Sequence, residues 1–123
     1  MVKPDCPKFG EIRFAQLPFN GSVQHGMRPV LIVQNDTGNM HSPTVEVLPL
    51  TSQVTKASHM PTHVFVGHNS ENGLKHDSII LGENVLTIPM DLLQQPIGVI
   101  DELTLLRVAL ARSIQSPLPY AGV

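Results

Sequence analysis

The chain has 123 residues and a mass of 13.4 kDa, which is enough for one domain and too little for two. Eight Lys and Arg residues against 10 Asp and Glu residues give a formal net charge of −2, so a polybasic arm is excluded. The single cysteine, Cys6, excludes an internal disulfide and a cysteine-based zinc cluster. Because no apolar run approaches the ~20 residues of a membrane span and no signal peptide is recognised, we expect one cytoplasmic domain over residues 1–123. Its termini, residues 1–8 and 117–123, are expected to be loose.

Short β-type segments separated by turn residues fill the first three-quarters of the chain. Residues 11–16 alternate apolar and polar side chains, as a half-buried strand does, whereas residues 29–33 form a continuous apolar run typical of a central strand covered on both faces. Further strands are expected at residues 44–48, 62–66, 78–81 and 84–88, the last of these being the final long strand. Residues 17–27 read as a long flexible loop and residues 35–42 as a turn.

The C-terminal part of the chain has a helical period instead. Asp101 is a suitable N-cap, and Pro117 cannot continue a helix, so a helix is predicted between them. Its apolar residues recur at helical spacing and are expected to pack against the domain; they are Leu103, Leu106, Leu110 and Ile114. A shorter helical turn is expected at residues 90–94. Strands first and a helix last favour a mainly β fold with α: a small antiparallel barrel or curled sheet with the helix packed outside.

The histidines do not form a metal site at the sequence level. His59 and His63 are four residues apart, but Pro61 between them opposes a helix, and in a strand they would lie about 13 Å apart. We therefore expect exposed histidines in loops and at strand edges, and neither a metal nor another cofactor. Phosphate-binding P-loop, dinucleotide and serine-hydrolase motifs are not found either.

Two stretches combine residues that could carry chemistry. A glycine-rich loop empties into Arg28 at the start of the buried strand, which places a charged guanidinium fork beside backbone N–H donors and suits a phosphate. Downstream, another strand ends in the hydrogen-bonding run Thr51-Ser52-Gln53. From residue types alone, one shared site and two unrelated surface turns both remain open.

The ordered series of motifs resembles the MazF/PemK-like toxin ribonucleases. It begins with Gly-Glu-Ile at residues 10–12, continues with Gly-Met-Arg-Pro-Val-Leu at 26–31 and Gln-Asn-Asp at 34–36, and includes Leu-Thr-Ser-Gln at 50–53. Pro-Thr-His-Val at 61–64, Asp-Ser-Ile-Ile-Leu at 77–81 and Ile-Asp-Glu at 100–102 complete it. The resemblance runs from residue 9 to about residue 114, so it covers most of the chain.

This resemblance implies the fold and the activity of the family. The fold is the small antiparallel barrel-like sheet of the MazF/CcdB-type plasmid-maintenance toxins, and the protein is a homodimer. The activity is sequence-specific, metal-independent cleavage of single-stranded RNA by the substrate's own 2′-hydroxyl, which inhibits translation and growth. Arg28 and Thr51 match the family's catalytic pair, and weaker candidates for RNA contact are Gln24, Ser52, Gln53, Gly21 and Gly26. The expected partner is a cognate antitoxin of a type II toxin–antitoxin system, whose disordered acidic tail covers the RNA groove.

One departure from the family's pattern lies in the glycine-rich loop. Where many members have an acidic residue, this chain has Val23, and His25 follows two residues later. Either His25 transfers a proton, or it is only a polar loop residue and the enzyme is slow. The alternative function is a non-catalytic or decayed toxin-fold binding protein. A topoisomerase poison of the CcdB type is disfavoured, because that variant expects a C-terminal Trp and the chain has none, and DNA binding is not expected.

Overall fold

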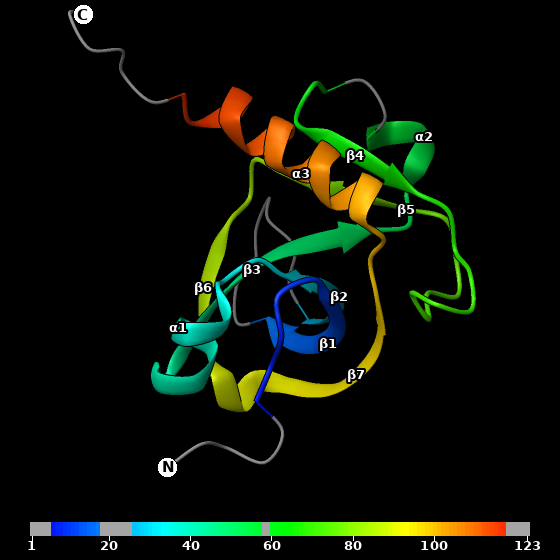
Figure 1. The fold of residues 1–123 in the computed structure, drawn as a ribbon. Helices are drawn as coiled ribbons and strands as arrows, with labels where there is room; N and C mark the ends of the chain where they lie inside the picture. The colour runs from blue at the N-terminus through cyan, green and yellow to red at the C-terminus, as the bar shows by residue number, and fades with distance from the viewer. Residues whose placement is uncertain (1–5, 18–25, 58–59, 118–123) are drawn as a thin grey trace, which may run out of the picture.

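The structure, a computed structural model, describes residues 6–17, 26–57 and 60–117. In chain order its elements are β1 (Glu11–Leu17), β2 (Gly26–Ile32), α1 (Asp36–His41), β3 (Thr44–Thr51), α2 (Val54–Ala57), β4 (His63–Val66), β5 (Ser78–Leu81), β6 (Leu86–Pro89), the 3-10 helix η1 (Met90–Leu92), β7 (Leu93–Val99) and α3 (Glu102–Gln115) (Figure 1). The mainly β fold with a C-terminal helix is therefore confirmed.

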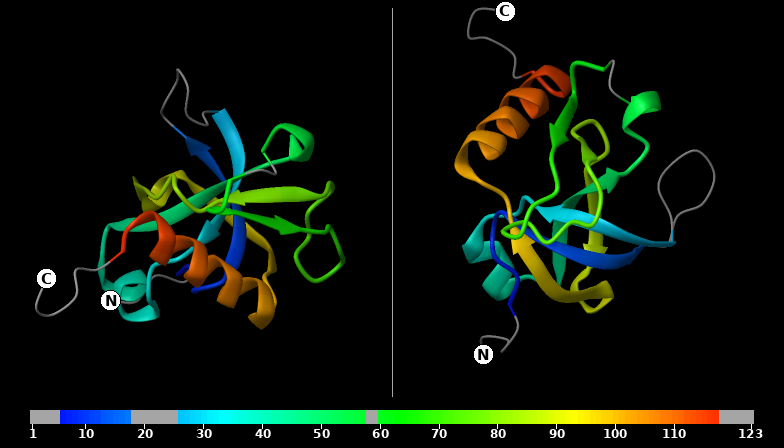
Figure 2. Two further views of the ribbon diagram at one scale, coloured as in Figure 1. Left: turned by 90° about the horizontal axis from the view of Figure 1, so that it is seen from above. Right: turned by 90° about the vertical axis from the view of Figure 1, so that its right-hand side faces the viewer.

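The strands form one antiparallel sheet that does not close into a barrel. Its order is β4-β5-β3-β2-β1-β7, and β6 pairs with the other end of β3. Figure 2 shows that the strands curve around one another while α3 lies beside β4 on one side of the sheet. Of the two architectures that the sequence favours, the curled open sheet is the one observed.

Buried apolar side chains form a cluster on each face of the central strands. The cluster beneath α3 includes Leu31, Leu48 and Val108, and the opposite cluster includes Val30 and Ile32. Because β2 contributes to both clusters, the prediction of a central strand covered on both faces is confirmed. Fully burying one such side chain stabilises the fold by about 1.5–3 kcal/mol.

β1 is more buried than its alternating sequence predicts. Arg13, expected on a solvated face, is only 3% exposed. Its guanidinium lies 3.0 Å from Oε1 of Glu11 and donates a hydrogen bond to the Gln94 carbonyl. The half-buried prediction was wrong here because β7 pairs with this side of β1 and supplies an acceptor that no local pattern indicates.

The helix α3 has the predicted limits but a different packing. Asp101 caps it by accepting hydrogen bonds from the Thr104 N–H and hydroxyl, and the helix ends before Pro117. The inner face is formed by Thr104, Val108 and Ala111. We call the predicted apolar series the outer stripe: Leu103, Leu106, Leu110 and Ile114 are 57, 59, 59 and 54% exposed. The expectation that these four pack into the domain was wrong, since the helix carries two apolar faces and the other one faces the sheet.

The segment predicted as a turn contains a helix. The expected turn at residues 35–42 contains α1, because the Asn35 side chain accepts from the Gly38 N–H and the fully buried Asn39 donates to the Gln34 carbonyl.

The strand expected at residues 84–88 is β6, but it is not the last strand, since β7 follows η1. β7 contains Pro96 and pairs irregularly at the sheet's end, where a proline is tolerated. The helical turn expected at residues 90–94 is confirmed in part, as η1.

The N-terminal segment is held from Cys6 onwards. The Cys6 thiol donates to the Asn39 carbonyl at 3.0 Å, and Lys8 N–H donates to Glu11. Residues 6–8, expected to be loose, therefore contact the sheet and α1. No helix among the described residues is long and apolar enough to cross a membrane.

Candidate active site

Arg28 lies near the start of β2, a central strand of the sheet. It is paired with Ala15 of β1, and β2 is paired with β3 through Val30 and Pro49. The β2–β3 pairing ends at Val30 and Pro49, before Arg28 and Thr51 are reached, and Thr51 pairs with β5 instead. Arg28 and Thr51 therefore lie just beyond the paired parts of two neighbouring strands.

Thr51 is the last residue of β3 and pairs with Ile79 of β5. Only 8% of the residue is exposed, and its Oγ1 accepts a hydrogen bond from the Gln53 N–H at 3.2 Å. This bond orients the hydroxyl and uses one oxygen lone pair, so the hydroxyl hydrogen can be donated to a substrate oxygen. Gln53 itself is exposed.

A cavity of about 230 Å³ opens beside these strand ends. Its apolar lining comes from β1, β2, β3, β7 and the segment that joins β4 to β5. The lining residues are Phe14, Arg28, Pro29, Leu50, Ser52, Gly73, Leu74, Lys75, His76, Ser78 and Ile97. Because ligand pockets typically have about 300–1,000 Å³, this cavity has room for a single small group. Its lining combines apolar side chains with the cations Arg28 and Lys75, which suits a small anionic group such as a phosphate.

The connecting segment, residues 67–77, is a polar loop with a rigid framework. Asn72, 2% exposed, donates to the Gly67 carbonyl, and its Oδ1 accepts from the Asn69 and Leu74 N–H groups. The loop also lies directly on β7, where the Val99 N–H donates to the Glu71 carbonyl. We refer to it below as the β4–β5 loop.

Two glycines permit this close contact between the loop and β7. A Cβ on Gly73 would lie 2.0 Å from the Ile97 carbonyl oxygen, and a Cβ on Gly98 would lie 2.3 Å from the Glu71 oxygen. Gly73 also has a φ of 70°, which side-chain-bearing residues rarely adopt. The backbones therefore pack against each other only because both side chains are absent.

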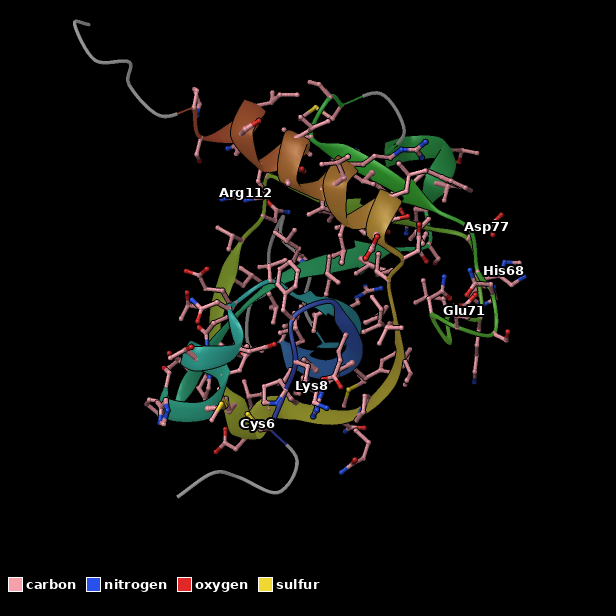
Figure 3. All side chains as sticks on the ribbon, viewed as in Figure 1. Cys6, Lys8, His68, Glu71, Asp77 and Arg112 are labelled. Carbon is pink, nitrogen blue, oxygen red and sulfur yellow. The ribbon has the colours of Figure 1, made fainter. Side chains whose placement is uncertain are left out.

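A histidine–carboxylate pair closes the base of the β4–β5 loop. His68 Nδ1 donates to Oδ1 of Asp77 at 2.6 Å, and the His68 backbone N–H donates to the same oxygen. These hydrogen bonds hold the pKa of the Asp77 carboxyl below its usual range. Figure 3 shows His68, Glu71 and Asp77 gathered on this loop, which projects from the sheet.

A second pair lies outside the cavity lining. His63 Nε2 is 2.8 Å from Oε2 of Glu83, and the His63 side chain is only 9% exposed. Burial acts to raise the pKa of the Glu83 carboxyl, but hydrogen bonds from His63, the backbone and Thr62 outweigh it and lower the pKa. The expectation of an exposed histidine was therefore wrong at His63, because strand β4 places it against this carboxylate. No group of three or more metal-ligating side chains occurs among the residues that the structure describes.

The predicted site residues are only partly brought together. Arg28 and Ser52 line the cavity, Thr51 adjoins Ser52 at the strand end, and Gly26 is the first residue of β2. Gln24, His25 and Gly21 lie outside the described residues.

Sequence reasoning missed the contribution of the β4–β5 loop. Lys75, His76 and Ser78 line the cavity although they are distant from Arg28 in the chain. The loop's polar composition indicates only a solvated turn, and the contact with β7 that places it is not visible in any local pattern. The available signal was that Lys75 and His76 come directly before the strand predicted at residues 78–81.

Comparison with known proteins places the chain among bacterial toxins. A family model described as PemK-like, MazF-like toxin of type II toxin-antitoxin system matches residues 8–114. The chain is 44% identical over 96 residues to Endoribonuclease EndoA of Bacillus subtilis, covering 77% of this chain and 81% of that protein. It is 45% identical over 87 residues to Endoribonuclease MazF of Staphylococcus saprophyticus, covering 70% and 71%.

Solved structures agree with these sequence relationships. The Mycobacterium tuberculosis toxin MazF-mt6 superposes with a TM-score of 0.74 at 28% identity, covering 89% of this chain and 99% of that one. A mycobacterial endoribonuclease in complex with its cognate antitoxin gives 0.71 at 24% identity, covering 95% and 99%. A Deinococcus radiodurans MazF structure gives 0.78 at 16% identity, covering 92% and 98%, which shows the shared fold alone.

Proposed function

Because this chain belongs to the family of PemK-like, MazF-like toxins of type II toxin–antitoxin systems, we propose that it is an endoribonuclease that cleaves single-stranded RNA. Its relatives in Bacillus and Staphylococcus are named endoribonucleases. The substrate proposed is messenger RNA, cut at specific sequences, so that translation and growth stop. Since messenger RNA is translated in the cytoplasm, the toxin acts there.

The chemistry needs few protein groups because the nucleophile belongs to the substrate. The 2′-oxygen attacks the adjacent phosphorus, the bond from phosphorus to the 5′-oxygen breaks, and a 2′,3′-cyclic phosphate and a 5′-hydroxyl result. The protein holds the phosphate in line and stabilises the charge that develops on its oxygens. The Arg28 guanidinium can donate two parallel hydrogen bonds to those oxygens, and the Thr51 hydroxyl can donate another.

The observation that carries this proposal is the arrangement of Arg28 and Thr51. The two are on neighbouring strands, Arg28 lines the cavity together with Ser52, and Thr51 is the strand residue next to Ser52. The buried Thr51 hydroxyl is oriented by the Gln53 N–H before substrate binds. Such preorganised donors act on a developing anion without further rearrangement.

The proposal is tested by incubating the purified protein with a long single-stranded RNA. We expect cleavage that chelator does not slow, cyclic-phosphate and 5′-hydroxyl ends, and no cleavage where the nucleotide before the scissile bond carries a 2′-deoxy substitution. Cleavage of the deoxy substrate would exclude the internal nucleophile. Binding of RNA without any cleavage would instead support the alternative, a non-catalytic toxin-fold protein.

Two protein partners follow from the proposed function. The first is a cognate antitoxin with a disordered acidic tail, which would compete with RNA for the cavity that Arg28 and Lys75 flank. The second is another copy of this chain, seated on the outer stripe of α3. Each of its four side chains is more than half exposed, a contiguous apolar surface of the kind that homodimer interfaces cover.

A further inference from the structure

The proposed mechanism leaves one proton transfer without a donor. When the bond to the 5′-oxygen breaks, that oxygen departs as an alkoxide unless a proton reaches it. Arginine stays protonated at any working pH, and a threonine hydroxyl is too weak an acid to supply the proton. Among the described residues that line the cavity, His76 is the one histidine, the residue type that most readily donates and accepts protons near neutral pH.

The β4–β5 loop holds His76 in place at both ends. The Ser78 hydroxyl donates to the His76 carbonyl at 2.9 Å, and the next residue, Asp77, is bonded to His68. Upstream, the buried Asn72 fixes the backbone through Leu74. Hydrogen bonds on both sides therefore hold the backbone where His76 lines the cavity, as a group that acts on one atom requires.

The charged groups around His76 come from β2 and from its own loop. Arg28 from β2 and Lys75 from the same loop share the cavity with it, and both are cationic. The neighbouring carboxylate, Asp77, is engaged by His68. These two cations can bind an RNA phosphate in the cavity that His76 also lines.

We propose that His76 is a further catalytic residue, the general acid that protonates the leaving 5′-oxygen. This inference rests on the proposed function. As the 2′-oxygen bonds to phosphorus, its hydrogen passes to water; as the bond to the 5′-oxygen breaks, the His76 imidazolium gives a proton to that oxygen. The neutral imidazole then regains a proton from water, and no metal or further reactant takes part. General acids of this kind contribute about 10²–10⁴-fold.

A substrate with a sulfur in place of the bridging 5′-oxygen tests the assignment directly. A thiolate leaves without protonation, so removal of a general acid should slow only the oxygen substrate. We expect His76→Gln to cleave ordinary RNA about 10²–10⁴-fold more slowly than the wild type. On the 5′-bridging phosphorothiolate the variant should match the wild type. It should also lose the decline in rate that deprotonation of the acid causes at high pH.

Two matched variants separate catalysis from binding and from surface effects. Lys75→Gln, the preceding residue, removes a cavity cation and should weaken binding of both substrates alike. His41→Gln, an exposed histidine of α1, should leave both rates unchanged. Because His76 is exposed, His76→Gln should keep the wild-type unfolding temperature, and imidazole added to His76→Ala should restore part of the cleavage of ordinary RNA.

Three outcomes would overturn this assignment. Equal slowing of the oxygen and sulfur substrates would make His76 a binding residue, and full-speed cleavage of ordinary RNA by His76→Gln would leave it no role. If the wild type cleaves neither substrate, the proposed function fails, and the assignment of His76 fails with it. Only selective loss on the oxygen substrate supports the general acid.

Discussion

The substitution Asn72→Ala tests whether the β4–β5 loop is held by one buried side chain. The Asn72 amide makes three hydrogen bonds of 2.9 to 3.1 Å, to the Gly67 carbonyl and from the Asn69 and Leu74 N–H groups. Alanine leaves these three backbone groups without the partner. The residue is 2% exposed, so water can replace the amide only if the loop opens.

The expected loss of stability follows from those three bonds. A buried hydrogen bond contributes about 0.5–1.5 kcal/mol net, so removing three should lower the free energy of unfolding by about 2–4 kcal/mol. For a domain of this size each kcal/mol corresponds to about 3–5 °C in the unfolding midpoint. The midpoint should therefore fall by about 6–20 °C. The cleavage rate should also fall at temperatures where the variant is still folded, because the same loop carries Lys75 and His76.

Thermal unfolding followed by circular dichroism, with RNA cleavage assayed well below the midpoint, measures both effects. Glu71→Ala is the matched control, since its side chain is exposed while its backbone N–H and carbonyl keep their bonds. Exposed substitutions of this kind stay within about 0.5 kcal/mol. If Asn72→Ala unfolds at the same temperature as Glu71→Ala, the loop is held by its contact with β7 and not by this amide.

Further predictions concern the phosphate site, the acid limit of stability and the assembly. Arg28→Ala should slow single-turnover cleavage about 10²–10³-fold at an unchanged unfolding temperature; a wild-type rate would remove Arg28 from the site. The pKa of Glu83 lies below its ordinary value of 4.5, so its contribution to stability is complete above that pH and is lost as the carboxyl protonates below it. Urea midpoints should accordingly fall between about pH 5 and pH 3 less steeply in Glu83→Gln than in the wild type. Leu110→Lys, in the outer stripe, should yield a monomer by sedimentation with α3 still folded; a persistent dimer would place the interface elsewhere.

Local sequence signals were sufficient where an element is decided by its own residues. The helix α3 has a capping side chain at Asp101 and a terminating Pro117, so it was predicted close to its limits. The apolar run at residues 29–33 identified β2, but the strand begins three residues earlier, at Gly26, and thus includes residues expected in a loop. α1 lacked such signals because Gly38 and Asn39 disfavour a helix. It forms because Asn35 and the buried Asn39 supply hydrogen bonds that only the folded context completes.

The candidate site was predictable in its strands and not in its loop. Arg28 and Thr51 could be linked through a motif series, and they lie on the neighbouring strands β2 and β3. His76 lines the same cavity because the β4–β5 loop lies on β7. The sequence did not predict β7, since this strand contains Pro96 and pairs irregularly at the end of the sheet. Contacts between segments so distant in the chain leave no local periodicity to detect.

The cavity draws its walls from nearly the whole length of the chain, from Phe14 in β1 to Ile97 in β7. A ribosome-bound chain that has emerged only through β5 already contains Arg28, Thr51 and His76, yet the strand that supports the loop is still inside the exit tunnel. The cavity is then incomplete, because the wall that Ile97 contributes is missing. Because β7 is the last strand of the sheet, the complete cavity forms only after nearly the whole chain has been made.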